Sequence, residues 1–323
     1  MKTIVYTQYG GPEVLHIKEI EKPTPKESEV LIKTHATTVT AGDWRARSLE
    51  LPPGFGFLGR LMFGISKPRQ PILGMEISGE IESVGKEVTK FKIGDQVFAS
   101  TGASMGCQTQ YLCLPENGSV TLKPTNLSYD ESAAMSFGGT TALHFFRKAK
   151  LQSGEKILIN GASGGVGTAA VQLAKHFGAE VTAVCSGSNT ELVKSLGADH
   201  VVDYTKDDFT KNGQTYDVIM DNAGTAPFSR CKGSLKKQGR FLLIMGGFLQ
   251  LLQTPLISMF SKKKILGGVA SSQKESLEYL AKLAEKKEFK PFIDRRYPFD
   301  QIVEAHRYVD TGRKKGNVVI TWL

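Results

Sequence analysis

The feature that most constrains the fold is a glycine-rich turn, NGASGGVGTAAVQ, at residues 160–172. A short apolar run, KILIN, precedes the turn, and a helical pattern that ends before Gly178 follows it. A strand that enters a glycine turn and a helix that leaves it predict a βαβ unit. Apolar runs and helical patterns continue to alternate as far as GRFLLIMGG, which predicts a doubly wound α/β domain with a parallel sheet.

The turn matches three motifs. Residues 161–165 fit G-x-S-x-G, in which Ser163 would be a hydrolase nucleophile. Residues 161–167 contain the glycine spacing of short-chain dehydrogenases. Residues 162–167 fit G-x-G-x-x-G with alanine in the first place, which is a dinucleotide-binding turn.

Two of these interpretations find no support elsewhere in the sequence. A hydrolase needs a histidine downstream of its serine, but His176 lies on the helix that leaves the turn and His200 comes just before an apolar strand. His306 lies on an amphipathic helix, where we expect a surface position. No tyrosine is followed four residues later by lysine, so the short-chain dehydrogenase pair is missing. A dinucleotide turn is favoured, and a tight turn that binds nothing is the alternative.

The turn itself supplies the expected phosphate contacts. Gly164 and Gly165 have no side chains, so a pyrophosphate can approach their backbone N–H groups. The helix that begins near Val166 directs its positive dipole end at the same anion. Ser163 is then a phosphate neighbour, not a nucleophile. No lysine follows the final glycine, which excludes a P-loop.

The segment VCSGSNTE, residues 184–191, indicates which dinucleotide is bound. Proteins that bind NAD place an acid at the end of the second strand to hold the ribose hydroxyls, but here no acid precedes Glu191. Ser186 and Asn189 offer hydroxyl and amide donors that suit a 2′-phosphate. The cofactor is therefore predicted to be NADPH. The loop contains no arginine or lysine, and Tyr204 or the basic run 313–315 is the hypothetical substitute.

The residue pattern before and after the α/β region differs from the alternation of strands and helices within it. Residues 1–122 contain short β-branched or alternating runs separated by turns, which predict a β-rich, barrel-like unit. A helix is expected to begin at Ser128, with Glu131 at capping-box spacing. Two amphipathic helices, the second capped by Asp300, and a final strand NVVITWL close the chain. We expect a catalytic domain from residues 1–122 and 267–323, and an NADP-binding domain at 123–266.

Composition narrows the remaining possibilities. A chain of 323 residues favours two domains. The formal charge of +9 comes from dispersed Lys and Arg, so no nucleic-acid partner is expected. The four cysteines show no C-x-x-C spacing and suit a reducing compartment. The N-terminus lacks the apolar core of a signal peptide, which predicts a cytoplasmic protein. The apolar segment 248–260 is too short to span a bilayer and is expected to be buried or at an interface.

Several stretches of the sequence resemble the medium-chain dehydrogenase/reductase superfamily across the whole chain. They are LGMEISGEIESVG, FKIGDQVFA, GTTAL, ILINGASGGVGTAAVQLAKHFGAEVTAVCS and ELVKSLGADHVVDY. Within the superfamily the chain resembles the zinc-free quinone-oxidoreductase-like enzymes, which include alkenal/alkenone reductases. The resemblance implies a discontinuous GroES-like catalytic domain, a Rossmann-like domain and an NADPH-dependent oxidoreductase.

The zinc ligands of the superfamily are replaced in this sequence. Zinc alcohol dehydrogenases of the superfamily carry a cysteine ligand in the loop where this chain has TVTAGD, with Thr40. Their Gly-His-Glu corresponds here to Gly74-Met75-Glu76. Their four-cysteine structural lobe is also missing. Threonine and methionine cannot replace thiolate and imidazole as zinc ligands, so no metal site is expected.

A reductase without a Lewis acid needs an activated acceptor, such as a quinone or an α,β-unsaturated carbonyl. Negative charge then spreads onto a carbonyl oxygen, which hydrogen-bond donors can stabilise. The resemblance makes Thr40 and Arg45 the candidate donors, at positions where related quinone reductases often have Asn and Tyr. A structural ion pair is the alternative role for Arg45. The further cofactor contacts that the resemblance implies are Thr141, Asn222, Gly246 and Asn317.

Three expectations concern the molecule beyond its reaction. Residues 48–71, rich in Gly, Pro and Phe, form either a hydrophobic lid over the substrate or an ordinary surface loop. A homodimer would form through an edge strand near RFLLIM. Because the usual Asn and Tyr are replaced, the alternative function is an NADPH-binding protein with little turnover, in a structural or membrane-associated role.

Overall fold

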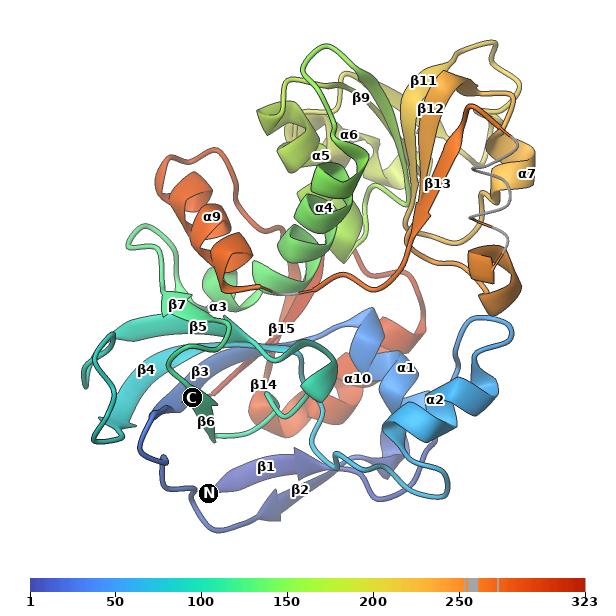
Figure 1. Cartoon of the computed structure of the whole chain (residues 1–323). Coiled ribbons are helices and arrows are strands. Elements are labelled where there is room, and N and C mark those ends of the chain that lie inside the picture. Colours follow the sequence, from blue (N-terminus) through green and yellow to red (C-terminus); the bar gives the residue numbers. More distant parts are fainter. Residues whose placement is uncertain (253, 255–260, 272, 323) are drawn as a thin grey trace. The chain divides into compact units, whose positions relative to one another are not determined.

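The computed structural model describes residues 1–252, 254, 261–271 and 273–322. The chain divides into two compact units. The β-rich unit comprises Met1–Leu51, Gly56–Thr140 and Ser272–Leu323, and the parallel-sheet unit comprises Pro52–Phe55 and Thr141–Ser271 (Figure 1). The domain boundaries expected from the sequence, at 122/123 and 266/267, stay a prediction.

The parallel-sheet unit is built on strands in the order β10-β9-β8-β11-β12-β13, and each neighbouring pair runs parallel. The strands are β8 (Lys156–Asn160), β9 (Glu180–Cys185), β10 (His200–Asp203), β11 (Tyr216–Asp221), β12 (Leu235–Leu243) and β13 (Lys264–Gly267). Strand β8 is apolar almost throughout because both faces of a parallel sheet are covered. The strand order reverses beside β8, which lies between β9 and β11. A crevice at this switch point is the usual ligand site of such sheets.

One helix precedes these strands and the others connect them. They are α4 (Ser136–Ala149), α5 (Gly165–His176), α6 (Thr190–Ser195) and α7 (Phe228–Cys231). Helix α5 packs on β8 and β9, and Figure 1 shows α4 and α5 in front of the sheet. Helix α5 buries Ala170, Leu173 and Ala174 and ends before Gly178, whose φ of +77° suits glycine. The predicted alternation of strands and helices is confirmed.

The β-rich unit contains a largely antiparallel sheet in the order β14-β15-β3-β4-β5-β7, with β6 also paired to β3 and a separate β1-β2 pair. Its strands are β1 (Lys2–Val5), β2 (His16–Glu19), β3 (Glu29–Val39), β4 (Glu76–Val84), β5 (Gln96–Ser100), β6 (Tyr111–Pro115), β7 (Val120–Leu122), β14 (Ile293–Pro298) and β15 (Asn317–Thr321). Its helices are α1 (Ala41–Ser48), α2 (Gly56–Phe63), α3 (Tyr129–Ala133), α9 (Lys274–Glu285) and α10 (Ile302–Asp310). Strand β15 pairs with β3 and returns the end of the chain to this unit. The expected α/β class, with a GroES-like domain and a Rossmann-like domain, is confirmed.

The long helix expected from Ser128 is divided into α3 and α4. The predicted capping box is present: Glu131 N donates to Ser128 Oγ at 3.2 Å, and Ser128 N donates to Glu131 Oε2 at 2.9 Å. A second helix start follows because Phe137 N donates to the Glu76 carboxylate at 2.6 Å. This contact joins α4 to β4, and a local sequence pattern cannot show it.

Two expectations about α10 are wrong. Asp300 does not cap the helix, because residues Phe299–Gln301 form a 3₁₀ turn and the N-cap is Gln301, without a side-chain hydrogen bond. His306 is fully buried instead of lying on the surface. Its Nε2 lies 3.4 Å from Gln108 Oε1, and burial holds the pKa of the imidazole well below its usual value.

Two further expectations concern the parallel-sheet unit. The strand near RFLLIM is not an edge strand, because β12 is paired on one side with β11 and on the other with β13. A dimer cannot extend the sheet through it. Of the apolar segment 248–260, residues 253 and 255–260 lie outside the described residues. Within the described part, Leu249 and Leu252 are exposed, so these two side chains are not buried within the chain, and the alternative of an interface stays a prediction.

Candidate active site

The glycine turn lies between the end of β8 and the start of α5, as predicted. Gly161 has a φ of +75°, which is the left-handed conformation that favours glycine. A Cβ on Gly167 would lie 2.1 Å from the Gly161 carbonyl oxygen, so only glycine lets α5 pack this closely on the turn. A Cβ on Gly164, by contrast, would meet only Gly161 O, at 3.6 Å. Space is therefore left beside Gly164.

The start of α5 has the properties of an anion site. Its N-cap is Gly164, which has no side chain to accept a hydrogen bond from the first turn. The backbone N–H groups of a helix start carry partial positive charge and need acceptors. A phosphate that approaches Gly165 and Val166 would supply them.

Ser186 and Asn189, predicted to bind the 2′-phosphate, lie together with Ser163, the predicted phosphate neighbour of the glycine turn. Asn189 Nδ2 donates to Ser163 Oγ at 3.1 Å and to Ser186 Oγ at 3.2 Å. Asn189 Oδ1 is buried and has no hydrogen-bond partner in the protein. The cluster therefore retains hydrogen-bonding capacity beside the start of α5, which fits a polar ligand.

Asn222 provides a second open position. It follows β11, and its backbone N–H donates to Asn160 O at 3.1 Å. Both polar atoms of its side-chain amide, Nδ2 and Oδ1, are buried without a partner in the protein. Because a buried unpaired amide costs free energy, two unpaired atoms on one side chain point to a ligand group. This observation supports the predicted cofactor contact at Asn222.

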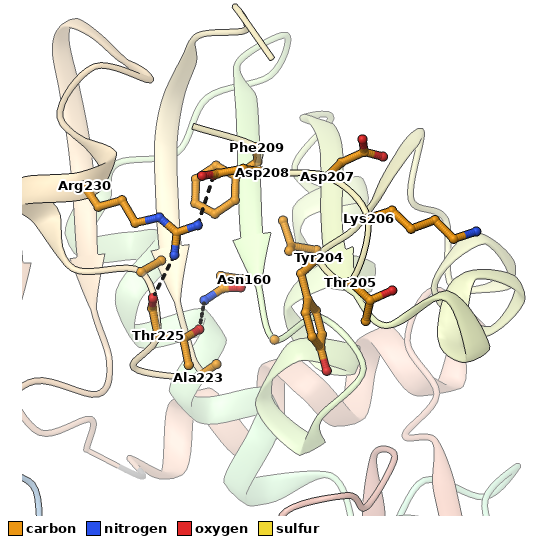
Figure 2. Close-up of a pocket in the computed structure, with 13 residues that line it drawn as sticks. Asn160, Tyr204, Thr205, Lys206, Asp207, Asp208, Phe209, Ala223, Thr225 and Arg230 are labelled. Carbon is orange, nitrogen blue, oxygen red and sulfur yellow. Dashed lines mark hydrogen bonds and ion pairs between the residues drawn. The ribbon is translucent and has the colours of Figure 1, made fainter. Parts of the chain in front are cut away.

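A pocket of about 490 Å³ opens at the same edge of the sheet (Figure 2). Its lining comes from the ends of β8 and β9 and from the loops after β10 and β11: Asn160, Gly161, Val184, Tyr204, Thr205, Lys206, Asp207, Asp208, Phe209, Ala223, Thr225, Ala226 and Arg230. Asn160 Nδ2 donates to Thr225 Oγ1 at 2.9 Å and to Asp221 Oδ1 at 2.8 Å. Arg230 pairs with Asp208 at 3.0 Å (Figure 2). The predicted contact Tyr204 is exposed in this lining.

Sequence reasoning missed an acid close to the 2′-phosphate cluster. Asp203 ends β10, beside Cys185 at the end of β9. A Cβ on Gly187 would lie 2.5 Å from Asp203 Oδ2, so the carboxylate adjoins the loop that was expected to contain no acid. Hydrogen bonds from the Thr205 hydroxyl (2.7 Å) and backbone (3.0 Å) hold the pKa of Asp203 below its usual value. The sequence could have predicted this contact, because Asp203 ends the next strand along the chain and the ends of neighbouring parallel strands meet at one edge of a sheet.

The other predicted cofactor residues lie in different places. Thr141 is buried in α4, and Gly246 follows β12, where a Cβ would lie 2.5 Å from Leu243 Cδ2. Asn317 belongs to the β-rich unit. Its side-chain Nδ2 and its backbone N both donate to Phe292 O, at 3.0 and 2.9 Å. The Asn317 amide therefore joins β15 to the segment before β14.

The candidate acceptor side lies in the β-rich unit, where β3 ends and α1 begins. Thr40 is the N-cap of α1 and forms a capping box with Asp43. Thr40 Oγ1 accepts from Gly42 N at 3.1 Å and donates to Asp43 Oδ2 at 2.7 Å. Asp43 is fully buried and also accepts from Gly74 N at 2.6 Å. The hydroxyl of Thr40 is therefore already engaged on both sides.

Two ionisable side chains of this region, Arg45 and Glu76, have shifted pKa values. Arg45, in α1, has its guanidinium 5.6 Å from the Trp44 ring, and burial lowers its pKa. Glu76 is fully buried and accepts from Thr38 Oγ1 at 2.6 Å and from Phe137 N. Burial raises the pKa of Glu76 to about 7. A carboxylate at the start of β4 therefore titrates near neutral pH.

The groups at the superfamily's zinc position do not fit zinc. Thr40 Oγ1 and Met75 Sδ lie 3.6 Å apart and contact each other. A neutral hydroxyl and a thioether are poor zinc ligands compared with thiolate and imidazole. Burial raises the pKa of the nearby Cys107 thiol to about 12, which keeps it protonated. Among the described residues, no group of three or more His, Cys, Asp or Glu side chains is placed to hold a metal ion.

Comparison with known families matches both parts of the chain. Residues 26–151 match the alcohol dehydrogenase GroES-like domain. Residues 196–320 match the family described as zinc-binding dehydrogenase.

Similar proteins extend over nearly the whole chain. A tomato (Solanum lycopersicum) protein named 2-methylene-furan-3-one reductase is 34% identical, over 99% of this chain and 79% of its own length. An Arabidopsis thaliana protein named NADPH-dependent alkenal/one oxidoreductase, chloroplastic, is 30% identical over 99% of this chain and 79% of its own length. The solved quinone oxidoreductase of Coxiella burnetii is 27% identical and superposes with a TM-score of 0.88, over 100% of this chain and 99% of that one.

The comparisons contradict the expectation of a cytoplasmic protein. Relatives 30–32% identical are named chloroplastic or mitochondrial. The expectation rested on the absence of an apolar signal-peptide core, but organelle transit peptides are amphipathic and have no such core. In the part of the chain that the structure describes, no helix is long and apolar enough to cross a membrane.

Proposed function

Because the chain belongs to the medium-chain dehydrogenase/reductase superfamily, in its zinc-free quinone-oxidoreductase-like branch, we propose that it is an NADPH-dependent reductase. The acceptor is a quinone or an α,β-unsaturated carbonyl. The observation that carries this proposal is the set of unpaired polar groups beside the α5 turn, above all the buried amide of Asn222. A protein interior leaves such groups unpaired at a cost, which a bound ligand removes.

The parallel-sheet unit supplies all but one of the proposed cofactor contacts. Gly164, Gly165 and Val166 offer backbone space and N–H groups to the pyrophosphate. Ser163, Ser186 and Asn189 bind the 2′-phosphate through hydroxyl and amide groups that already form one cluster. The remaining proposed cofactor contacts are Tyr204, Asn222, Thr141, Gly246 and Asn317.

The acceptor side works without a metal. When bound, NADPH supplies the hydride, which reduces a quinone or the β-carbon of an enone. The negative charge that develops on the carbonyl oxygen needs hydrogen-bond donors, because no Lewis acid stabilises it. Arg45 and Thr40 are the proposed donors. Since Thr40 already donates to Asp43, it would have to redirect its hydroxyl hydrogen, whereas Asp43 fixes where that hydroxyl lies.

The test is NADPH oxidation by the whole protein, with an enone such as octenone and, separately, an ortho-quinone. We expect turnover with at least one acceptor and a slower rate with NADH. Arg45→Lys and Arg45→Ala lower kcat with the preferred acceptor if Arg45 stabilises the carbonyl oxygen, and Arg147→Ala is the control. No turnover with any acceptor would contradict the proposal.

A second candidate function is an NADPH-binding protein with little turnover. The engaged hydroxyl of Thr40 favours it, because a donor that is already used cannot assist the reaction. NADPH binding without turnover in the same assay would support this candidate. A homodimer is proposed only in general terms. Since β12 is an internal strand, such a dimer would use another surface.

A further inference from the structure

Helix α2 carries an apolar surface that faces solvent. The side chains of Phe57, Leu58, Leu61, Met62 and Ile65 are each between 40 and 74% exposed. The pairs Phe57/Leu61 and Leu58/Met62 are four residues apart, so they form two adjacent rows on the helix. Ile65 lies two residues after the end of the helix. We call these five residues the α2 patch.

The helix that carries the α2 patch is fixed to the rest of the β-rich unit. Tyr9 Oη donates to Gly64 O at 2.8 Å, and Arg69 N donates to Phe63 O at 2.7 Å. On the other side of the helix, Phe63 packs against the core of the β-rich unit. A Cβ on Gly59 would lie 1.9 Å from Leu51 Cδ1, so the helix approaches its own unit closely at this glycine. The orientation of α2 is therefore fixed with its apolar rows outward.

The charged residues of the segment that contains α2 have one sign. Between Glu50 and Glu76 the chain contains no acidic residue. It contains three basic residues in that interval, Arg60, Lys67 and Arg69, and all three are exposed. Arg60 Nη1 donates to Ile65 O at 2.8 Å, which places a guanidinium beside the patch. The whole chain carries a formal charge of +9, so no overall negative charge opposes an anionic partner.

We propose that the α2 patch docks on an anionic lipid surface. An apolar row of Phe, Leu, Met and Ile beside Arg and Lys is the composition of helices that lie in the membrane interface. The apolar side chains enter the boundary between headgroups and acyl chains, and Arg60, Lys67 and Arg69 pair with lipid phosphates. Each basic residue near such a surface raises partitioning by about fivefold at moderate ionic strength.

Charge and geometry favour lipid over a protein partner. The segment around the patch contains no acidic side chain. Its charged groups are therefore all cations, which can pair with the phosphates of lipid headgroups. A helix of this length buries too little area for a stable protein interface by itself. The proposal does not depend on the reaction of the proposed function, since it rests only on the β-rich unit.

The test is sedimentation of the whole protein with vesicles of phosphatidylcholine alone and with about one third phosphatidylglycerol, at low and high salt. We expect binding to the anionic vesicles that weakens with salt. The double variants Phe57→Ser/Met62→Ser and Lys67→Glu/Arg69→Glu each reduce the bound fraction at least about tenfold. Ile93→Ser removes an equally exposed apolar side chain elsewhere in the same unit and leaves binding unchanged.

Four outcomes would overturn the proposal. They are no binding to anionic vesicles, equal binding to both vesicle types, unchanged binding by Phe57→Ser/Met62→Ser, and unchanged binding by Lys67→Glu/Arg69→Glu. Thermal unfolding and NADPH titration of each variant show that it is folded. If the α2 variants change only the KM for a soluble enone, the patch serves the substrate and the proposal is also wrong.

Discussion

Two loops of this molecule have the same place between a strand and a helix but differ in their hydrogen bonds. Each follows a strand and begins a helix: residues 161–164 between β8 and α5, and Thr40 between β3 and α1. At α1, Thr40 and Asp43 form a capping box and satisfy the first N–H groups of the helix. At α5 the N-cap is a glycine, with no side-chain hydrogen bond. A helix start can receive an anion only where its own side chains leave the N–H groups open.

The surroundings of the two loops strengthen this difference. Near α5, the Asn222 amide and Asn189 Oδ1 are buried without partners. Near α1, Asp43 accepts from Thr40 and from Gly74, and Glu76 accepts from Thr38 and Phe137. The α5 turn therefore retains unused polar groups for a ligand, whereas the polar groups of the α1 loop are already hydrogen-bonded to one another.

The largest effect is expected from Gly167→Ala in the α5 turn. The added Cβ would lie 2.1 Å from the Gly161 carbonyl oxygen, which is backbone and cannot move away cheaply. The free energy of unfolding should fall by about 3 kcal/mol, and NADPH affinity should fall about a hundredfold because α5 is displaced. Chemical denaturation and cofactor titration measure the two effects.

Gly233→Ala is the control, because a Cβ there has no neighbour within 4 Å. Gly164→Ala gives a finer test, since its Cβ would meet only Gly161 O at 3.6 Å. This variant should keep its stability and lose cofactor affinity. If Gly164→Ala is as unstable as Gly167→Ala, the space beside Gly164 is structural and not a phosphate site.

The second-largest effect is expected in the pH dependence of the free energy of unfolding, through Glu76. Burial raises the pKa of its carboxyl in the folded protein to about 7, above the ordinary value of 4.5. Between these two values the folded state holds a proton that the unfolded state has lost, so stability falls as pH rises. The expected loss between pH 4.5 and 7 is up to about 3 kcal/mol.

Glu76→Gln should remove most of this dependence, measured by denaturation at a series of pH values. Burial lowers the pKa of Lys314 to about 8. This lysine therefore stays protonated between pH 4.5 and 7 and does not contribute to the difference between the two proteins. An equal slope in both proteins would show that Glu76 is ionised throughout.

Thr40→Val should have a smaller effect on stability. Valine has the shape of threonine but cannot accept from Gly42 N or donate to Asp43, so the α1 cap is lost. The free energy of unfolding should fall by about 1 to 2 kcal/mol, while NADPH affinity stays unchanged. Thr40→Ser keeps the hydroxyl and should restore stability. If Thr40→Val leaves the free energy of unfolding unchanged, the Thr40 hydroxyl does not stabilise the start of α1.

The smallest effect is expected from Asp203→Asn. The carboxylate adjoins Gly187 in the loop proposed to bind the 2′-phosphate, and its charge opposes that phosphate. The ratio of NADPH to NADH affinity should rise by about fivefold, the size of a single partly screened charge effect. Asp207→Asn is the matched control in the same pocket lining. A fall in the ratio would mean that Asp203 supports the loop that holds the phosphate.

The sequence predicts the α5 turn well because the turn depends on local sterics. Gly161 needs a positive φ and Gly167 needs the absence of a Cβ, and both requirements are visible in the order of residues. The strands around the turn are predicted for the same reason, since their apolar runs reflect burial within one segment. The family resemblance extends the prediction to both units.

Contacts between distant segments account for the features that the sequence does not predict. Glu76 begins a second helix at Phe137, and Gln108 approaches the buried ring of His306, across separations of 61 and 198 residues. Asp203 reaches the loop after β9 only because the two strands are neighbours. Each of these side chains looks ordinary in its own sequence context. Their roles follow from the strand order, which a single sequence does not state.

The most direct test of the central claim is equilibrium titration of the whole protein with NADPH and with NADH, without any acceptor. The open groups beside α5 predict that NADPH binds at least about tenfold more tightly than NADH, because one additional charge-assisted contact is worth at least that much. Asn189→Ala should reduce this preference and leave NADH binding little changed. Equal affinities, or tighter binding of NADH, would contradict the assignment of the α5 turn and its neighbours as an NADPH site.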